Sequence, residues 1–171
     1  QPGTAAEYLV VPERNVVKLD VDWQWPEAAA LPLSTITAWR MLTTRAQLVP
    51  GETVLVWGIG GGVSLAALQI AKHLGARAVV TSSSDEKLAR AKARGADVLL
   101  NHTRDDVARE VRKLTGMGAD VVADSVGAKT WDASLTALRP GGRLVTCGAP
   151  TGPHVQLDLR RTPRLERLPP A

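Results

Sequence analysis

One stretch of the sequence constrains the fold more than any other: VLVWGIGGGVSLAALQIAKHLGARAVVTSSSDEK, residues 54–87. It runs from a short apolar segment through four glycines into a helical pattern, and then into a second apolar segment. Similar alternation continues to about residue 147, with short connections. Apolar segments that do not alternate with polar residues are typical of strands covered on both faces. The chain is therefore predicted to form an α/β fold, a doubly wound parallel sheet of the Rossmann type.

The alternation predicts five strands and four helices. The expected strands are 53–57, 78–81, 97–100, 120–123 and 143–147, and the expected helices are 63–74, 85–94, 105–114 and 129–138. Ahead of them, residues 5–12 are predicted to form a short strand. Residues 25–51 are predicted to form two short helices that Pro32 separates, because proline interrupts a helix interior.

The glycines at 58–62 follow the first strand directly and precede a helix with apolar residues at helical spacing. In a Rossmann unit, such glycines let a phosphate approach backbone N–H groups, and the helix N-terminus adds free donors. A strict G-x-G-x-x-G starting at Gly58 fails because residue 63 is valine. The alternative G-x-x-G-x-x-G uses Gly58 and Gly61, with Ser64 in the third place. Glycine-rich turns also serve as tight corners, but the succession of strand, turn, helix and strand favours dinucleotide binding.

The end of the second strand indicates which dinucleotide is bound. A carboxylate about 20 residues beyond the glycines usually binds the ribose hydroxyls of NAD. Here that place is Ser82, followed by Ser83, and no carboxylate stands there to repel a 2′-phosphate. The serine hydroxyls and Lys87 can hold such a phosphate. Asp85 favours NAD, but it is better explained by helix capping and the helix dipole. The pattern therefore favours NADP, with NAD as the alternative.

Three segments resemble the cofactor domain of the medium-chain dehydrogenases/reductases. They are GETVLVW…LLNH at 51–102, GADVVADSVG…GAPTG at 118–152, and AAALPLSTITAWRML at 28–42. Within the superfamily, the chain is similar to the zinc-type alcohol dehydrogenase and quinone oxidoreductase branches. The resemblance implies an oxidoreductase that transfers hydride between a nicotinamide cofactor and an alcohol, carbonyl, quinone or enone.

Carried over by position, the resemblance also implies where the cofactor lies. The implied cofactor-binding residues are Gly58, Gly61, Gly62 and Val63 at the pyrophosphate; Ser82, Ser83 and Lys87 at the adenosine ribose; Asn101, with His102, on the adenine side; Ser125, Val126 and Gly127 beneath the cofactor; and Gly148, Ala149 and Thr37 at the nicotinamide. Simpler roles stay open for three residues: a helix hydrogen bond for Thr37, a surface position for His102 and a structural carboxylate for Asp124. The sequence assigns no catalytic residue.

Departures from the family pattern limit the expected activity. The zinc ligands of these enzymes come mostly from an N-terminal lobe, and Leu33 stands where some relatives have a further ligand cysteine. One cysteine and three scattered histidines make no set with zinc spacing, so the sequence supports no zinc site. We expect residues 1–47 to be a remnant of the substrate lobe with linking helices, 48–158 a dinucleotide-binding domain, and 159–171 a disordered Arg/Pro-rich tail. Such a chain is expected to bind cofactor without completing the reaction alone.

Composition restricts the partners. Cys147 is the single cysteine, which excludes an intramolecular disulfide and favours the cytoplasm. No run of 18 apolar residues suggests a membrane span. The net charge of +4 depends on arginines in the last dozen residues, so nucleic acid is not an expected partner. Small-molecule substrates are expected, and a homo-oligomer is possible.

Three other functions compete with the oxidoreductase. A non-catalytic dinucleotide-binding or interaction module is the main alternative. An S-adenosylmethionine-dependent methyltransferase is suggested by LRPGGRL at 138–144, but Ser82 lacks the acidic group that such enzymes use. A serine hydrolase is suggested by GVSLA at 62–66, but Ser64 lies within the helix rather than in the sharp turn after the strand.

Overall fold

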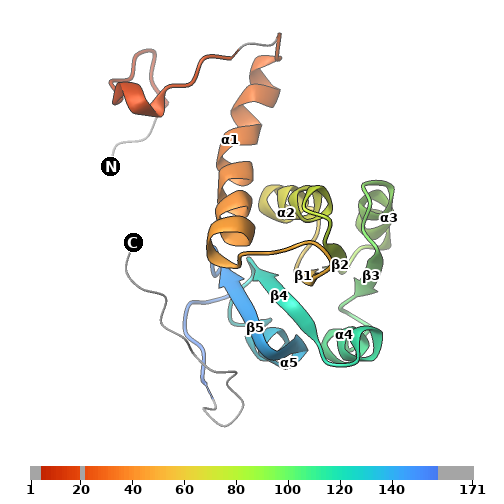
Figure 1. Cartoon of the computed structure of the whole chain (residues 1–171). Helices are drawn as coiled ribbons and strands as arrows, with labels where there is room; N and C mark the ends of the chain where they lie inside the picture. Colours follow the sequence, from red (N-terminus) through yellow and green to blue (C-terminus); the bar gives the residue numbers. More distant parts are fainter. Residues whose placement is uncertain (1–4, 20–21, 158–171) are drawn as a thin grey trace. The chain divides into compact units, whose positions relative to one another are not determined.

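A computed structural model describes residues 5–19 and 22–157 of the chain (Figure 1). The chain divides into two compact units, residues 1–31 and 32–171. The first contains a short 3₁₀ helix, η1 (Glu13–Asn15), and the beginning of helix α1 (Trp25–Trp39). The second contains the sheet. The expected tail, 159–171, lies outside the described residues.

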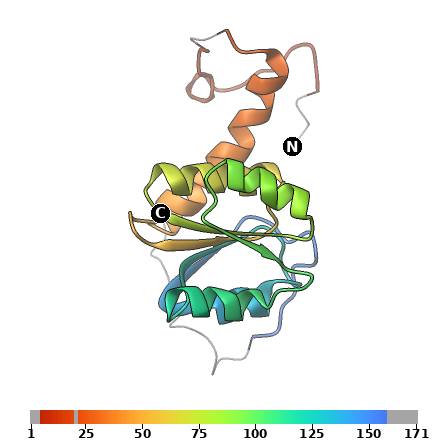
Figure 2. The same ribbon diagram turned by 90° about the vertical axis from the view of Figure 1, so that its right-hand side faces the viewer.

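The sheet has five parallel strands in the order β3-β2-β1-β4-β5. The strands are β1 (Thr53–Val56), β2 (Arg77–Ser82), β3 (Val98–Asn101), β4 (Ala119–Asp124) and β5 (Leu138–Thr146). The helices that connect them are α2 (Gly62–His73), α3 (Asp85–Ala93), α4 (Val107–Thr115) and α5 (Trp131–Ala137). Figure 2 shows α2 and α3 on one face of the sheet and α4 and α5 on the other. The predicted doubly wound Rossmann fold is confirmed.

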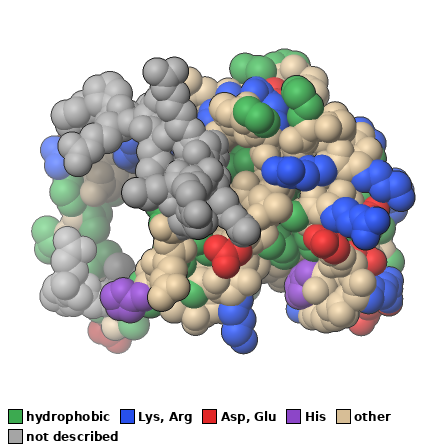
Figure 3. Space-filling model, turned by 90° about the horizontal axis from the view of Figure 1, so that it is seen from below, with side chains coloured by type: hydrophobic (Ala, Val, Ile, Leu, Met, Phe, Trp, Pro, Cys, Tyr) green, Lys and Arg blue, Asp and Glu red, His purple; other side chains and the backbone are tan. Residues whose placement is uncertain are grey.

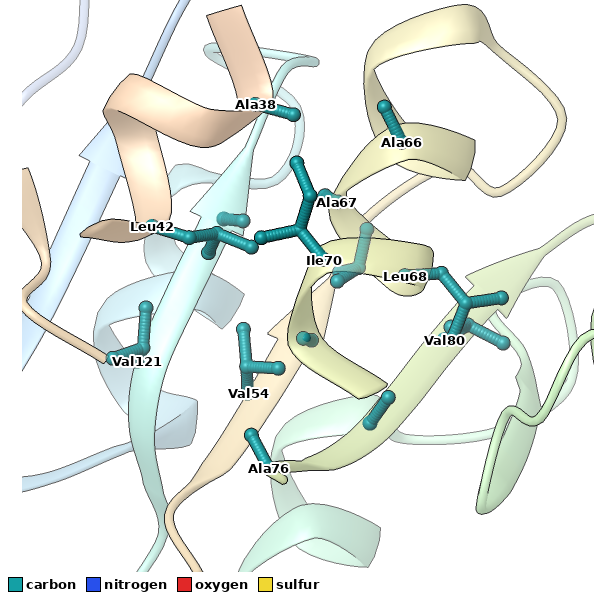
Figure 4. Packing of buried hydrophobic residues seen from close by; sticks show 14 of the residues in the cluster. Ala38, Leu42, Val54, Ala66, Ala67, Leu68, Ile70, Ala76, Val80 and Val121 are labelled. Carbon is teal, nitrogen blue, oxygen red and sulfur yellow. The ribbon is translucent and has the colours of Figure 1, made fainter. Parts of the chain in front are cut away.

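The core lies on both faces of the sheet because every residue of β1 is buried. On one face, small residues of α2, including Ala66 and Ala67, belong to one buried cluster with Val54 and Val80 of the sheet (Figure 4). Leu42, from the segment before β1, belongs to the same cluster. Burying one such aliphatic side chain contributes about 1.5–3 kcal/mol. This packing fixes the position of the N-terminus of α2 above the end of β1.

The segment before the sheet differs from the prediction of two short helices. Helix α1 continues through Pro32, and a π-helical segment, η2 (Arg40–Arg45), follows it directly. A proline removes one backbone hydrogen bond and costs about 3 kcal/mol in a helix interior. Here the helix formers on either side and the buried contacts of Ala38 and Leu42 outweigh that cost.

Two strand predictions also differ from the structure. Residues 5–12 form no strand, and the side chains of Tyr8 and Val10 are almost fully exposed. An extended segment needs a neighbour for its backbone hydrogen bonds, which local sequence does not reveal. Strand β5 begins at Leu138 instead of Arg143, because Leu138 already pairs with Ala119. A register shift follows, and Pro140 and Gly141 lie in the irregular part that the sequence suggested was a loop.

The surface of the described residues carries mixed charge. On the face in Figure 3, Lys and Arg side chains lie beside Asp and Glu side chains over the right-hand part of the view. None of the helices in the described ranges combines the length and apolar character needed to cross a bilayer.

Candidate dinucleotide-binding site

The glycine turn between β1 and α2 is attached to the neighbouring strand β2. Gly58 has a φ of 68° and donates its backbone N–H to the hydroxyl of Thr81, at 3.1 Å. The backbone N–H of Ile59 donates to the carbonyl oxygen of Thr81, at 2.7 Å. Gly60 has a φ of 122°, which side chains rarely permit. Thr81 therefore holds a turn whose shape requires glycine at two places.

Ser64, in the third place of the glycine motif, stabilises the same turn from the other side. Its side chain is buried, 3% exposed, and its hydroxyl lies 2.9 Å from the carbonyl oxygen of Gly58 and 3.0 Å from that of Gly61. The hydroxyl hydrogen is shared between these two acceptors. The departure from three glycines thus adds hydrogen bonds without preventing close packing of α2.

Gly61 and Gly62 are glycines for different reasons. A Cβ atom at Gly62 would collide with the side chain of Ser34, so the packing of this helix requires glycine there. Gly61 has an ordinary φ of −85°, and a Cβ there would meet only the Ser64 hydroxyl, at 3.6 Å. Gly61 is also the N-cap of α2 and has no side-chain cap. The N–H groups of a first helical turn have no partner within the helix, so they are available to an anion.

The β2–α3 turn lies at the carboxyl end of the next strand. Ser82 is 4% exposed, and its hydroxyl accepts a hydrogen bond from the backbone N–H of Ser84, at 3.1 Å. Ser84 in turn caps α3 by accepting from the N–H of Lys87, at 3.3 Å. The Lys87 side chain lies over Gly60, with Nζ 3.5 Å from where a Cβ of Gly60 would be. Ser82, the exposed Ser83 and Lys87 are therefore gathered beside the glycine turn.

Asp85 forms an ion pair and is not the cap of α3. Both of its oxygens accept from the guanidinium of Arg104, at 2.9 Å each, and one accepts from the Asn101 amide at 3.0 Å. The hydrogen bonds from Arg104 and then from Asn101 lower the pKa of Asp85, and Asp85 raises the pKa of Arg104. Sequence reasoning missed Arg104. Because β2 and β3 are adjacent strands, the segments that follow them lie close together. That adjacency is the signal that could have placed Arg104 beside Asp85.

Asn101 connects two turns through its side chain. Its amide nitrogen also donates to the carbonyl oxygen of Ser83, at 3.4 Å, and its amide oxygen accepts from the N–H and the hydroxyl of Thr103. These contacts occupy the amide group. The cofactor contact expected of Asn101 stays a prediction, and the structure gives the residue a role in holding the Ser83 turn.

Asp124 organises the turn after β4. The buried carboxylate accepts from the backbone N–H groups of Val126 and Gly127, at 2.8 and 3.1 Å. It also accepts from the hydroxyls of Thr130 and Ser134, both at 2.7 Å. Four donors surround this side chain, which has no exposed surface. This arrangement supports the structural role over that of a catalytic base.

The segment after β5 is tied to the same turn. Gly127 has a φ of 97°, and a Cβ there would lie 2.7 Å from Cα of Ala149. Thr151 donates its hydroxyl to the carbonyl oxygen of Val126, at 2.8 Å, and accepts from the N–H of Lys129, at 3.1 Å. Sequence reasoning also missed Thr151, since it is 25 residues from Val126. Gly148, by contrast, has nothing within 4 Å of where its Cβ would be.

A cavity of about 390 Å³ opens beside these turns. Its lining includes Trp57, Gly58, His102, Val126, Lys129 and Thr130. The Trp57 indole is 4% exposed, its N–H has no hydrogen-bond partner, and its ring centroid is 6.2 Å from that of His102. His102 is exposed and also lines this cavity. The cavity therefore combines apolar side chains with charged ones, while the indole N–H of Trp57 is itself buried.

The remaining expected site residues are placed as follows. Thr37 donates its hydroxyl to the carbonyl oxygen of Leu33 at 2.7 Å, the simpler role left open for it. Val63 and Ser125 are half-buried, and Val63 packs against the core. Among the described residues, no three His, Cys, Asp or Glu side chains gather closely enough to hold a metal ion. The expectation from the sequence that this chain holds no zinc ion stays a prediction.

Comparison with known proteins agrees with this geometry. Residues 62–167 match the model of the zinc-binding dehydrogenase family. The chain belongs to this family. It is 38% identical over 158 residues to a quinone oxidoreductase of Pseudomonas aeruginosa, covering 92% of this chain and 49% of the relative. The methyltransferase and serine hydrolase alternatives are thereby set aside.

Solved structures show the same relationship. A crystal structure of an NAD-dependent alcohol dehydrogenase superposes with a TM-score of 0.86 at 45% identity, over 93% of this chain and 47% of that one. A mycobacterial protein in complex with NADPH gives a TM-score of 0.78 at 40% identity, over 84% and 44%. The chain thus spans about half the length of these three relatives. The expected membership of the alcohol dehydrogenase and quinone oxidoreductase superfamily is confirmed.

Proposed function

We propose that this chain binds a nicotinamide adenine dinucleotide, with NADP preferred over NAD, as the cofactor-binding part of an oxidoreductase. The substrates would be an alcohol and its carbonyl, or a quinone or enone. Relatives named quinone oxidoreductase and NAD-dependent alcohol dehydrogenase support this class, as does a relative solved with NADPH.

The observation that carries the proposal is the position of two glycines that the fold itself does not require. Among the glycines of the described residues, only Gly61 and Gly148 combine an ordinary φ with no contact closer than 3.6 Å to an added Cβ. Gly61 stands at the uncapped N-terminus of α2. Gly148 follows β5, which β4 separates from β1 in the sheet. An extended ligand that crosses the carboxyl ends of the strands gives a reason for both.

The neighbouring groups suit the parts of such a ligand. The first turn of α2 would hold the pyrophosphate, because free N–H groups and the helix dipole favour an anion. Ser82, Ser83 and Lys87 would hold the phosphorylated ribose. The adenine would enter the cavity beside Trp57 and His102. Residues 48–158 would then form the functional domain.

The bound cofactor would supply hydride chemistry, and this chain would supply its position. Thr151, Asp124 and Gly127 fix the loops on the nicotinamide side through the contacts described above. No side chain among the described residues is assigned as a proton donor. The cytoplasmic location and a homo-oligomeric state remain predictions from the sequence.

The test is a titration of the chain with NADPH, comparing wild type with Gly61→Ala and Gly61→Val. Both variants are expected to fold, since the backbone at Gly61 is extended and has room for a Cβ. Alanine is expected to weaken binding moderately. Valine, whose branches would fill the pyrophosphate position, is expected to abolish it. Undiminished binding by a folded Gly61→Val variant contradicts the proposal.

A parallel assay of NADPH-dependent reduction of a quinone separates the two functional classes. Turnover supports the oxidoreductase. Binding without turnover supports the alternative of a non-catalytic dinucleotide-binding module.

A further inference from the structure

Each carboxylate at the start of α3 is paired with an arginine, but the two pairs come from different parts of the fold. Asp85 is held by Arg104, which lies on the connection between β3 and α4, through two hydrogen bonds of 2.9 Å. Glu86 is held by Arg90, one turn along the same helix, at 2.6 Å. Both pairs are exposed, so each is expected to contribute little to the stability of the fold.

Only the first pair is connected to the turn that would hold the ribose. The Asn101 amide nitrogen donates to Asp85, at 3.0 Å, and to the carbonyl oxygen of Ser83, at 3.4 Å. Asn101 is buried at the end of β3, in register with Ser82. The Asp85 carboxylate is therefore fixed beside the serine turn by one bridging side chain.

An unpaired carboxylate at this place would weaken the binding of a nucleotide whose ribose carries a 2′-phosphate. A 2′-phosphate carries a charge of about −1.5 to −2 at neutral pH, as phosphate monoesters do, and would be repelled. A ribose with free hydroxyls would be favoured, since a carboxylate accepts hydrogen bonds from them. Arg104 cancels this negative charge and also occupies both acceptor oxygens.

We propose that Arg104 sets the preference for a 2′-phosphorylated nucleotide by neutralising Asp85. This inference rests on the proposed function and names a residue that determines its specificity. Arg104 acts through Asp85 and is a positioning residue rather than a phosphate ligand. The apparent contradiction between a nearby aspartate and NADP binding is thereby resolved.

The test uses the whole chain with four sets of substitutions: Arg104→Gln, Asp85→Asn, the two combined, and Arg90→Gln as the matched control. NADPH and NADH are titrated separately by calorimetry at low and at physiological salt. Arg104→Gln is expected to lower NADPH affinity about fivefold at low salt, because Asp85 would then repel the phosphate. The loss is expected to be smaller at physiological salt, because ions screen the repulsion between exposed charges. NADH affinity is expected to stay the same or to increase.

Rescue distinguishes neutralisation from direct contact or a structural effect. In the double variant, the loss of Asp85 restores the net charge, so the ratio of NADPH to NADH affinity is expected to return to near the wild-type value. Arg90→Gln is expected to leave the ratio unchanged. An unchanged ratio in Arg104→Gln, or a fall that Asp85→Asn does not reverse, overturns the inference.

The outcomes also separate this inference from the proposed function. A wild-type chain that prefers NADPH, with a ratio insensitive to Arg104, overturns the inference and leaves the proposed function standing. A wild-type chain that binds neither nucleotide overturns both.

Discussion

The hydroxyl oxygen of Ser64 lies 2.9 Å from the carbonyl oxygen of Gly58, across the turn that joins β1 to α2. The first residue of the glycine turn is therefore tied to the first turn of the helix that follows it. This contact restrains the segment whose backbone N–H groups face the proposed pyrophosphate position.

Replacing Ser64 with alanine is expected to destabilise the protein. The substitution removes the hydroxyl donor and leaves the carbonyl oxygens of Gly58 and Gly61 without it, which costs about 1 kcal/mol. Urea denaturation measures the change in the free energy of unfolding. Ser64→Gly should cost about 1 kcal/mol more, because glycine is a poor helix former. An unchanged urea midpoint in Ser64→Ala would show that the turn does not depend on this contact.

Ser82→Asp is expected to reverse the nucleotide preference. An aspartate there can still accept from the N–H of Ser84, so the turn should be retained. Its charge would repel a 2′-phosphate and accept from free ribose hydroxyls, lowering NADPH affinity by roughly tenfold or more while NADH affinity is kept or gained. Ser82→Asn is the uncharged control. A wild-type preference for NADH that this substitution leaves unchanged would refute the serine-based choice of NADP.

Asp124→Asn is expected to be among the most destabilising changes in the chain. An amide in place of the carboxylate turns one acceptor into a donor, which would face the N–H groups of Val126 and Gly127 or the hydroxyls of Thr130 and Ser134. Leaving one such buried group without an acceptor costs about 1–3 kcal/mol. Asp132→Asn, on the exposed side of α5, is the matched control and should have little effect. Equal thermal stability of the two variants would contradict the structural role of Asp124.

The elements that the sequence predicted correctly are those with a strong local pattern. All four helices and five strands from residue 53 onward were expected, because their apolar runs and glycine turns are local signals. The start of β5 was missed because Pro140 and Gly141 resemble a loop, whereas Leu138 is placed by pairing with Ala119. The continuation of α1 through Pro32 was missed because tertiary packing outweighs a local cost.

The residues of the candidate site also divide into those that a local sequence pattern predicts and those that only tertiary contacts bring together. Gly58 and Gly61 lie in the turn after β1 and Ser82 is the last residue of β2, so the fold alone brings them to one edge of the sheet. Arg104 and Thr151 were not found, because their contacts with Asp85 and Val126 join segments that lie far apart in the sequence. Local spacing indicated that Asp85 belongs to the start of a helix, but not that Arg104, on the connection between β3 and α4, compensates its charge.

Asp120 and Asp97 lie at the amino ends of β4 and β3. They should make the free energy of unfolding depend on pH in the acid range. Burial raises the pKa of Asp120, but hydrogen bonds from the N–H of Thr53, at 2.7 Å, and from Arg139 lower it by more. Burial likewise raises the pKa of Asp97, and Lys72 with the N–H of Ala78 more than offsets this. In both cases the folded protein holds the carboxylate more strongly ionised than the unfolded chain does.

The sign of the pH effect follows from these lowered pKa values. An aspartate in the unfolded chain has a pKa of about 3.9, so the unfolded chain binds protons before the folded protein does as the pH falls. The stabilisation is therefore complete above about pH 5 and is lost as the pH falls through about 4 and below. Urea midpoints measured from neutral pH downward should be level at first and then decrease. Asp120→Asn should lower the neutral midpoint and make the decrease shallower, whereas Asp132→Asn should change neither. A midpoint that rises as the pH falls below 5 would show that these carboxylates do not stabilise the fold in the way their hydrogen bonds indicate.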